Sequence, residues 1–419
     1  EMLRLKQVRA WDFSDKSRFL YQVTRFLYDG QYGEAFTAYD IRIRPDFPGS
    51  QTVLGKHLLQ LKGAFGKDFT PLAQWVYNYV YDGITPINLW LEYEKEPSCQ
   101  LQLRIQFFQS GGIGELVKEI VYSEEDLKEP ILLDDFERYY LSFCLEAKGE
   151  GELKIGALHK RFSHGPFGEM TIGAQTLRDS KRQEIFAYFH PGDLKPPLNI
   201  YFSGYRPAEG FEGFVMMRRM GSPFILFSDP RLEGGSFYMG SQELEDQIVA
   251  YIDQHLDWLG FGPKEMNFSG LSMGTFGALY YGASYSPHAI LVGKPIINLG
   301  DVAANLKFKR PDEFGTSLDM MQLLVGQVSR EGIDLLNQRF WNRFNQADLK
   351  DTILALAYMR DDDYDQLAYP KILEALYDHP VRIISSSRPG RHNDATAPIV
   401  EWFLTQYKEI MERDFGRIE

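Results

Sequence analysis

The stretch EMNFSGLSMGTFGALYYGAS, residues 265–284, decides how the second half of this chain folds. Its centre, Gly270-Leu271-Ser272-Met273-Gly274, matches the pattern G-x-S-x-G between a predicted strand at 265–269 and a small-residue helix at 273–284. A serine on such a tight strand-to-helix turn projects its hydroxyl above the sheet, near the N-terminus of the helix that follows. The motif predicts a nucleophilic serine, and the alternative is a simple glycine-rich turn.

After Pro191, short apolar segments alternate with helical patterns. The predicted strands are 198–202, 224–227, 265–269, 289–297, 352–359 and 381–386, and the longer predicted helices are 241–259 and 398–415, the last with Thr396 as its cap. Strands that alternate with helices imply a mostly parallel sheet covered on both faces. Together with the serine motif, this predicts an α/β-hydrolase-like catalytic domain over residues 191–419.

The part of the chain before Pro191 is mostly strand-like. Alternating apolar residues predict strands at 87–93, 101–107, 140–145 and 152–158, with the last two separated by a turn at 149–151. Several such strands predict a β-sandwich-like domain over residues 81–190, an architecture that carbohydrate-binding modules often have. Residues 1–80 read as a mixed segment with one clear strand pattern at 35–44. Because the chain starts with Glu1 rather than Met, we expect this segment to be truncated.

A nucleophilic serine needs a histidine base and a carboxylate, here in the chain order Ser, Asp or Glu, His. Three histidines follow Ser272. His288 reads as a surface residue, and His379 precedes a strand and so lies at the wrong end of it. His392 follows the strand at 381–386, and catalytic groups gather at the carboxyl ends of parallel strands. We therefore predict that His392 is the base.

The acid is predicted in the acidic run that follows the strand at 352–359. This run holds four aspartates, at 361, 362, 363 and 365. We favour Asp362, then Asp363 and Asp361, and the residues leave the choice open because each of these side chains could equally be a solvated loop carboxylate. The acid would hold the imidazole tautomer and stabilise the imidazolium.

Two backbone N–H groups are expected to form an oxyanion hole. One is that of Met273, directly after the serine, and the other is that of Gly204 or Tyr205, in the loop after the strand at 198–202. Arg206 on the same loop would either contact a polar substrate or make a surface ion pair.

The composition excludes several other classes of function. The chain has 45 basic and 58 acidic residues, and the net charge of −13 disfavours binding to nucleic acids or anionic membranes. Two cysteines, Cys99 and Cys144, cannot build a structural zinc site alone, and both read as buried thiols. No metal-binding motif, signal peptide or apolar run long enough to cross a membrane is visible, so we predict no metal and no transmembrane segment.

Three segments of the C-terminal half resemble a known family. They are 270–278 (GLSMGTFGA), 390–394 (GRHND) and 402–407 (WFLTQY). Together they resemble accessory secretory protein two, the α/β-hydrolase-like subunit of the accessory Sec system of Gram-positive bacteria. The resemblance covers nearly the whole chain and is most specific after Leu198.

The resemblance implies a role in exporting serine-rich-repeat glycoprotein adhesins. Family members act in the cytoplasm, at the membrane-associated accessory translocase, with two sister accessory secretory proteins and the second SecA ATPase. Their Ser-acid-His site is linked to O-acetylation of N-acetylglucosamine on the adhesin. By motif match, Ser272 would be the nucleophile, His392 the base and Asp362 the acid. No tightly bound cofactor is expected, and an acetyl donor, for which acetyl-CoA is a candidate, would be a co-substrate.

Three readings of the activity stay open at this point. An O-acetyltransferase and an esterase or deacetylase differ only in whether a sugar hydroxyl or water attacks the acyl-enzyme. A lid that excludes water would favour transfer, and Phe314–Phe344, rich in apolar side chains, is the candidate covering segment. The third reading is a non-enzymatic export scaffold or chaperone, with aromatic surfaces for its partners.

Overall fold

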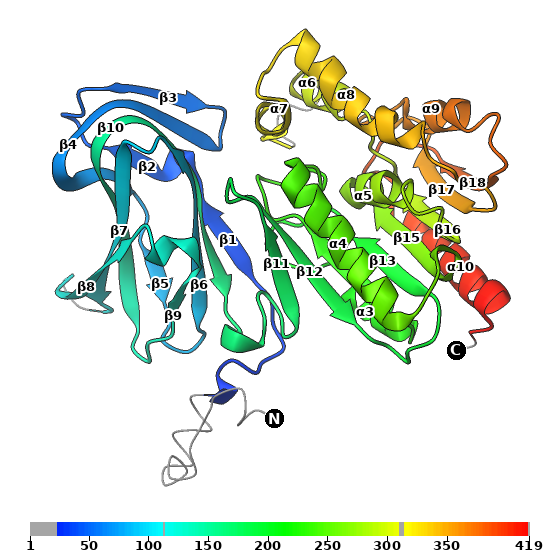
Figure 1. The fold of residues 1–419 in the computed structure, drawn as a ribbon, viewed down its shortest axis with the longest axis horizontal. Helices are drawn as coiled ribbons and strands as arrows, with labels where there is room; N and C mark the ends of the chain where they lie inside the picture. The colour runs from blue at the N-terminus through cyan, green and yellow to red at the C-terminus, as the bar shows by residue number, and fades with distance from the viewer. Residues whose placement is uncertain (1–22, 112–113, 310–313, 418–419) are drawn as a thin grey trace, which may run out of the picture. The chain divides into compact units, whose positions relative to one another are not determined.

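The fold is described by a computed structural model that covers residues 23–111, 114–309 and 314–417 (Figure 1). It divides into two compact units. The first comprises the described residues up to Val53 and Leu58–Ala174, and the second comprises Leu54–His57 and the chain from Gln175 onward. Residues 1–22, on which part of the N-terminal prediction falls, lie outside the described residues. The sequence placed the start of the second domain at residue 191, whereas the division in the structure falls before two further strands.

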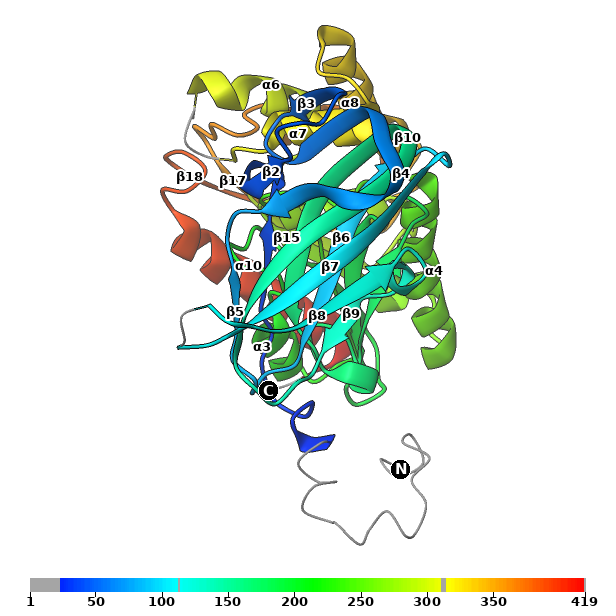
Figure 2. The same cartoon turned by 90° about the vertical axis from the view of Figure 1, so that its left-hand side faces the viewer.

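In the described residues of the first unit, ten strands form one sheet, accompanied by three short 3-10 helices. The elements are β1 (Gly33–Phe36), η2 (Ala38–Asp40), β2 (Ile41–Ile43), β3 (Ser50–Leu54), β4 (Leu58–Trp75), β5 (Tyr79–Tyr81), β6 (Ile87–Lys95), β7 (Cys99–Gln109), β8 (Leu116–Ser123), η3 (Asp126–Lys128), β9 (Ile131–Leu133), β10 (Tyr139–Phe162) and η4 (Gly165–Phe167). The main path of the sheet runs β2-β4-β10-β6-β9, and its buried side chains form one apolar core. Figure 2 shows the long, curved β4 and β10 that cross this sheet.

Two of the predicted strands are parts of a single strand. β10 runs for 24 residues through the predicted turn at 149–151, so the turn prediction is wrong. Gly149 has a φ of +90°, and the register with β4 shifts on either side of it. A glycine at such a bulge lets a strand bend without ending. β10 consequently pairs with β7 along Tyr139–Gly149 and with β6 along Leu153–Phe162.

The other strand predictions for this unit differ in outcome. The strands at 87–93 and 101–107 are confirmed as parts of β6 and β7. The pattern at 35–44 is divided among β1, η2 and β2, because a 3-10 turn interrupts it. All ten strands belong to one hydrogen-bonded sheet, so the pairing does not separate two facing sheets and the sandwich stays a prediction.

The second unit is an eight-stranded sheet with helices. The elements are β11 (Ala174–Arg178), β12 (Glu184–His190), β13 (Leu198–Phe202), α3 (Phe214–Arg219), β14 (Phe224–Ser228), α4 (Gln242–Leu259), η5 (Pro263–Glu265), β15 (Met266–Leu271), α5 (Met273–Gly282), β16 (Ala289–Gly293), α6 (Leu299–Lys309), α7 (Ser317–Val325), α8 (Arg330–Phe344), β17 (Ile353–Met359), α9 (Ala368–Ala375), β18 (Arg382–Arg388) and α10 (Thr396–Phe415). The strand order is β11-β12-β14-β13-β15-β16-β17-β18. β14, β13, β15, β16, β17 and β18 are mutually parallel, and β12 is antiparallel to β14.

The parallel sheet is covered on both faces, as predicted. Alternate residues of β15 point to opposite sides: Met266 and Phe268 belong to the large core formed with α4 and α5. Ser269 Oγ instead lies 3.4 Å from the hydroxyl of Tyr407 in α10. This two-sided burial explains why the strands read as short, continuous apolar runs.

The element predictions after Pro191 agree closely with the structure, with two corrections. β11 and β12 join this sheet, although the sequence assigned residues up to 190 to the first domain. Thr396 does not cap α10, since it is the first helical residue and its hydroxyl accepts a hydrogen bond from the ammonium of Lys294 at 3.0 Å. Ser241 does cap α4, by accepting the N–H of Leu244.

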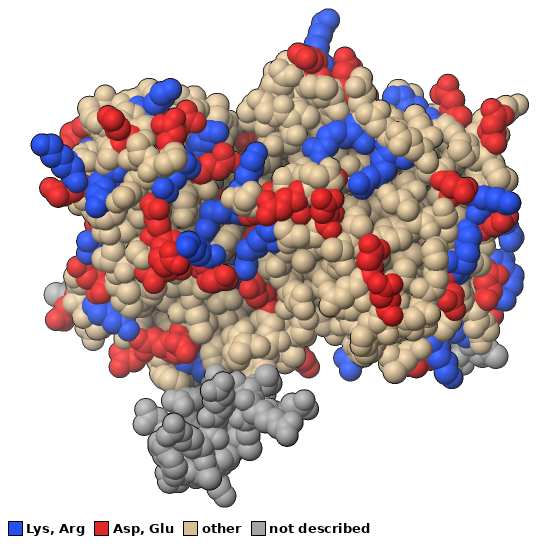
Figure 3. All heavy atoms as spheres, viewed as in Figure 1, with Lys and Arg blue, Asp and Glu red and all other residues tan. Residues whose placement is uncertain are grey.

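Among the described residues, no helix is both long and apolar enough to cross a membrane. Acidic and basic side chains are interspersed on the face that Figure 3 shows. Cys99 is buried and Cys144 is half-buried, and both are free thiols. Burial raises the pKa of each thiol to about 11, which keeps both protonated near neutral pH.

Candidate active site

Ser272 occupies a strained turn between β15 and α5. Its φ is +52° and its ψ is −119°, a conformation that non-glycine residues rarely adopt and that is found where function requires it. The Ser272 N–H donates to the carbonyl of Gly293 at 2.8 Å, which fixes the turn against the end of β16. The turn also brings α5 so close to β13 that a Cβ on Gly274 would lie 2.0 Å from the carbonyl oxygen of Phe202. The glycine of the motif is therefore required by close approach of two backbones.

The structure brings Ser272, His392 and Asp362 into one line. Ser272 Oγ lies 2.9 Å from His392 Nε2, and His392 Nδ1 lies 2.8 Å from Asp362 Oδ2. The three residues follow β15, β18 and β17, whose parallel carboxyl ends meet at one edge of the sheet. His392 is 1% exposed and Asp362 is 6% exposed, so the contact between them is shielded from water.

Each aspartate that the sequence left open has a different partner. Asp362 contacts the imidazole, as described above. Asp363 Oδ1 accepts the backbone N–H of His392 at 3.0 Å, and Asp361 Oδ2 accepts the backbone N–H of Gly390 at 3.1 Å. The acidic run therefore holds the histidine loop by its backbone at two points and the imidazole at a third.

The hydrogen bonds around Asp362 favour its ionised form. Burial opposes ionisation, but the hydrogen bond and charge interaction with His392, together with the N–H groups of Tyr364 and Asp365, outweigh it and lower the pKa of Asp362. The two N–H groups lie 2.8 and 3.2 Å from Asp362 Oδ1. An ionised carboxylate at this place can orient the imidazole and stabilise its protonated form.

The predicted oxyanion donors are not equivalent. Met273 is the first residue of α5, where backbone N–H groups have no partner within the helix. The Gly204 N–H is already used, because it donates to Glu212 Oε2 at 2.7 Å. Within the described residues, no hydrogen bond engages the N–H of Tyr205. Of the three predicted donors, Met273 and Tyr205 therefore stay candidates for binding a substrate oxygen.

Comparison with known proteins gives the family. Residues 1–417 match the family described as accessory Sec system GspB-transporter. The chain belongs to this family. It is 46% identical over 406 residues to an accessory Sec system protein of Streptococcus gordonii, covering 97% of this chain and 80% of that protein. It is 44% identical over 394 residues to the Staphylococcus aureus counterpart, covering 94% of this chain and 75% of that protein.

A solved structure of a relative has the same fold over the whole chain. It is a Glycosylation Associate Protein complex from Streptococcus agalactiae, with a TM-score of 0.93 at 40% identity, covering 100% of this chain and 81% of that chain. The family resemblance predicted from the segments at 270–278, 390–394 and 402–407 is therefore confirmed.

In this GspB-transporter-family chain, several polar residues near the site were not found by sequence reasoning. Lys294 follows β16, is 4% exposed and carries a buried ammonium group. Burial lowers the pKa of Lys294, and the charges of Asp362 and Glu212 act in the opposite direction. Lys294 and Glu212 were missed because a single lysine or glutamate in a loop has no recognisable sequence signal. Only the fold places these two residues near the nucleophile.

The acid loop is braced by Asp365, which the sequence reported only as a member of the acidic run. Its carboxylate accepts the N–H groups of Ile297 and Asn298 at 2.8 and 2.7 Å. Asn298 in turn accepts the indole N–H of Trp341 at 3.0 Å. Burial raises the pKa of Asp365. This carboxylate links the loop that carries Asp362 to the start of α6 and to α8.

Among the described residues Arg206 makes no ion pair, and its contact with a polar substrate stays a prediction. Its guanidinium donates to the carbonyls of Phe211 at 2.9 Å and Ala208 at 3.4 Å, and thereby closes its own loop. Among the described residues, no group of three or more His, Cys, Asp or Glu side chains is arranged to hold a metal ion.

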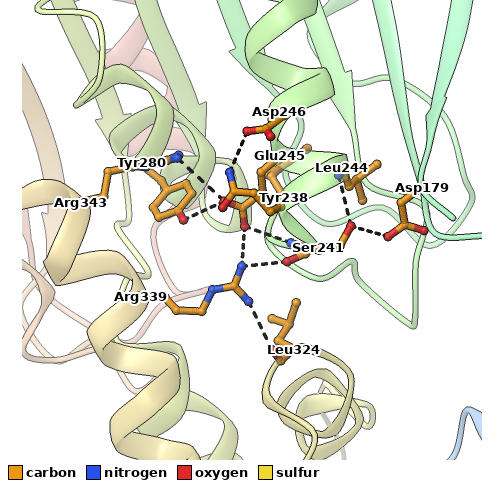
Figure 4. A network of polar contacts seen from close by, with 12 residues as sticks. Asp179, Tyr238, Ser241, Leu244, Glu245, Asp246, Tyr280, Leu324, Arg339 and Arg343 are labelled. Carbon is orange, nitrogen blue, oxygen red and sulfur yellow. Dashed lines mark hydrogen bonds and ion pairs between the residues drawn. The ribbon is translucent and has the colours of Figure 1, made fainter. Parts of the chain in front are cut away.

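The predicted covering segment folds into α7 and α8, which are tied to the body of the unit by a polar network (Figure 4). Its centre is Glu245 of α4, 3% exposed, whose carboxylate accepts Arg339 at 2.6 Å and the Tyr280 hydroxyl at 2.9 Å. Arg339 also donates to the carbonyls of Gly240 at 2.8 Å and Leu324 at 3.3 Å. The network joins α4, α5, α7 and α8 through one buried carboxylate.

The start of the covering segment lies near the oxyanion loop. A Cβ on Gly234 would lie 2.9 Å from the Tyr205 ring and 3.7 Å from the Phe314 ring, so both rings border the same backbone. The Thr316 hydroxyl exchanges hydrogen bonds with the backbone of Glu233 at 3.0 and 3.2 Å. These contacts are consistent with the predicted covering role of Phe314–Phe344, which stays a prediction.

Proposed function

We propose that the second unit is an α/β-hydrolase-like, serine-dependent acyltransferase that O-acetylates N-acetylglucosamine on a serine-rich-repeat adhesin. The observation that carries the proposal is the line from Ser272 Oγ through His392 to Asp362, at 2.9 and 2.8 Å, on a strained strand-to-helix turn. The mostly parallel sheet supports the fold assignment. The acetyl group and the sugar come from the family resemblance.

The first half-reaction would load the serine. His392 Nε2 accepts the Ser272 hydroxyl proton while Oγ attacks the acetyl carbonyl of the donor, and the carbonyl oxygen becomes an oxyanion. The N–H groups of Met273 and Tyr205 would bind this oxyanion, and each such donor contributes about 10²–10³ in kcat. The tetrahedral intermediate then collapses: the donor's leaving group departs with the proton from His392, and acetyl-serine remains. Acetyl-CoA is the candidate donor, with its thiol as leaving group.

The second half-reaction would transfer the acetyl group. A sugar hydroxyl gives its proton to His392 as its oxygen attacks the acetyl-serine, and the oxyanion again forms at the two N–H groups. Collapse returns the proton to Ser272 Oγ and releases the O-acetylated sugar. If water attacks instead, the same residues catalyse hydrolysis, which makes an esterase or deacetylase the second candidate. The network around Glu245, which holds α8 on the body, favours transfer because it supports a covered site.

We further propose that this activity accompanies a role in glycoprotein export within the accessory Sec system. Family membership supports the export role, and the relative from Streptococcus agalactiae was solved as a complex. Its partners would be two sister accessory secretory proteins, the second SecA ATPase and the adhesin itself, at the cytoplasmic side of the accessory translocase. The first unit would be a β-sandwich-like, carbohydrate-binding-module-like domain. A purely structural export factor is the non-enzymatic alternative.

Intact mass spectrometry of the exported adhesin tests the proposal. Cells carry the wild-type chain, Ser272→Ala or, as a matched control, Ser387→Ala near the end of β18, and export is recorded in the same cells. Loss of acetyl mass increments only in Ser272→Ala, with export retained, is the expected result. Unchanged glycan mass in Ser272→Ala overturns the acetyltransferase and leaves the hydrolase or the scaffold. Loss of both acetylation and export in Ser272→Ala, with the glycan mass then measured on adhesin retained in the cells, would overturn the separation of the two roles.

A further inference from the structure

The carboxylate of Glu212 holds the loop after β13, which carries the proposed oxyanion donor Tyr205. Glu212 Oε2 accepts the N–H of Gly204 at 2.7 Å and the hydroxyl of Tyr201 at 3.0 Å. Burial, and then the charge of Glu212, raise the pKa of Tyr201 well above its ordinary value, so its hydroxyl remains a donor. Both donors lie at the end of β13 or just after it, and both converge on the same oxygen.

The contact between the loop and Glu212 is reciprocal. The backbone N–H of Glu212 donates to the Ser203 hydroxyl at 3.0 Å, while the Glu212 carboxylate accepts the N–H of the next loop residue. Ser203 is 1% exposed, and its own N–H donates to the carbonyl of Phe227 at 2.9 Å. Its carbonyl accepts the hydroxyl of Tyr238 at 2.5 Å. Every polar group of Ser203 is thus engaged, and the loop has little freedom before Tyr205.

This carboxylate also lies at the junction with the nucleophile turn. A Cβ on Gly204 would lie 3.0 Å from the carbonyl oxygen of Leu271 and 3.1 Å from Glu212 Oε2. Leu271 directly precedes Ser272, so the Gly204 backbone is packed between the nucleophile turn and the Glu212 carboxylate. A displacement of that carboxylate would change the spacing between the oxyanion loop and the serine.

Lys294 is a buried cation whose charge acts on the same group of residues. Lys294 is buried after β16, and the charges of Asp362 and Glu212 both bear on its ammonium group. Its backbone N–H donates to the carbonyl of Ala357 at 2.8 Å, and the preceding carbonyl, of Gly293, accepts the N–H of Ser272. The Lys294 ammonium itself donates to the Thr396 hydroxyl at 3.0 Å, so Lys294 is linked to Asp362 and Glu212 by charge and not by a hydrogen bond.

We propose that Glu212 is a positioning residue for acyl transfer, whose carboxylate holds the Gly204 N–H so that the N–H of Tyr205 faces the oxyanion. This inference rests on the proposed function and adds to it a residue outside the Ser-His-Asp line. Glu212 touches no reacting atom and acts through the backbone of Gly204 and Tyr205. Its contribution would appear where charge develops on the substrate oxygen, which is in the transition state rather than in the bound substrate.

Steady-state kinetics of the full chain with p-nitrophenyl acetate separates this role from simple support of the fold. Removal of one oxyanion donor costs about 10²–10³ in kcat, so Glu212→Ala, which only misplaces one, is expected to lower kcat about 10–100-fold. The KM should change less than about threefold, because ground-state binding is not involved. Glu212→Gln keeps an oxygen acceptor for both donors and should retain kcat within about fivefold of wild type. Glu374→Ala, an exposed glutamate on α9, is the matched control.

Amide hydrogen exchange of the segment from Gly204 to Arg206 gives a readout that needs no turnover. Faster exchange in Glu212→Ala, with protection restored in Glu212→Gln, is the expected result, since the Gly204 N–H loses and regains its acceptor. If the wild type turns over the ester and Glu212→Ala has the same kcat, the inference is wrong and the proposed function stands. If wild type and Ser272→Ala are equally inactive, the proposed function is contradicted, and amide exchange alone then tests the role of Glu212. Unchanged protection in Glu212→Ala would show that the Glu212 carboxylate does not hold the Gly204 N–H.

A second variant covers the case in which Glu212→Ala does not fold. Tyr201→Phe keeps the buried ring and removes one of the two donors to Glu212 Oε2. A drop in kcat of about 3–10-fold at unchanged KM is then expected, and an unchanged kcat would count against the proposal.

Discussion

The imidazole Nε2 of His392 lies 2.9 Å from Ser272 Oγ, although 120 positions of the chain separate the two residues. The contact does not come from the local sequence around either residue. β15 and β18 each end at the same edge of a parallel sheet, with β16 and β17 between them, and the loops that follow close the distance. The contact is a consequence of strand order, which is why the relationship could be predicted from the motif and the chain order but not from local sequence.

Asp362 should differ sharply from its two neighbours when each is changed to Asn. Asp362→Asn keeps the shape but lets the imidazole take the wrong tautomer, and a loss of about 10⁴ in kcat is expected by analogy with serine hydrolases. Asp361→Asn and Asp363→Asn retain an oxygen that can accept the N–H of Gly390 or His392, so losses below about tenfold are expected. Ester hydrolysis rates of the three variants check this order, and equal losses would mean that the carboxylates act only as a charged cluster.

Gly274→Ala is expected to disrupt the nucleophile turn. The added methyl would lie 2.0 Å from the carbonyl oxygen of Phe202, a backbone atom that cannot move without displacing β13. The overpacking cost is about 3 kcal/mol or more, and soluble yield and the melting temperature should both fall. Gly282→Ala in the same helix is the control, because the atoms nearest its methyl would be side-chain atoms, of Ile290 at 3.0 Å and of Phe268 at 3.3 Å, and not backbone. Equal stability of the two variants would contradict this account of the motif.

The two halves of the site differ in how much the sequence revealed. The nucleophile, base and acid lie in or next to motifs with a fixed chain order, so Ser272, His392 and the run containing Asp362 could be singled out from residue types and predicted strand ends. The choice among the aspartates could not be made, because it depends on which carboxylate the turn directs at the imidazole and which two bind backbone N–H groups.

Glu212 and Lys294 had no comparable signal. Their relation to the site comes from loops after different strands, and strand order is a tertiary property. For the same reason, the residues of β11 and β12 were assigned to the preceding domain. Nothing in the local sequence determines which sheet a strand joins. The misplaced turn at 149–151 has a different cause: Gly149 at a bulge and a glycine in a hairpin turn look alike in sequence.

Arg339→Met should loosen α8 without removing its packing. The variant keeps the apolar stem and deletes the charge that Glu245 and two carbonyls bind, and a loss of about 1–3 kcal/mol in stability is expected because Arg343 lies 4.0 Å from the same carboxylate as a partial substitute. If α8 helps to cover the acetyl-serine, water should compete better with the sugar. The ratio of hydrolysis to transfer to N-acetylglucosamine measures this. Arg330→Met, at the exposed start of α8, is the control, and an unchanged ratio in Arg339→Met would argue against a covering role.

Asp414 provides a pH-dependent test of stability in the second unit. It lies 2.8 Å from His288 Nε2 and contacts Arg413, and these hydrogen bonds, led by that from Arg413, lower the pKa of Asp414 from 3.8 to about 2. A carboxyl whose pKa is lower in the folded state stabilises the fold above its unfolded pKa, and this contribution disappears as the pH falls towards the folded pKa. The full shift corresponds to about 2.4 kcal/mol, but the side chain is 17% exposed and screened by solvent, so about 1 kcal/mol is expected.

Asp414→Asn should therefore melt lower than wild type at pH 7, and the difference should shrink progressively below about pH 4. Melting curves of both chains between pH 7 and about pH 2, a range that includes both the unfolded and the folded pKa of Asp414, give the comparison. Asp257→Asn, an exposed position in the last turn of α4, corrects for the general effect of removing one negative charge from an acidic chain. A difference that stays constant over this range would show that the pair of His288 and Asp414 contributes through packing rather than through the charge of the carboxylate.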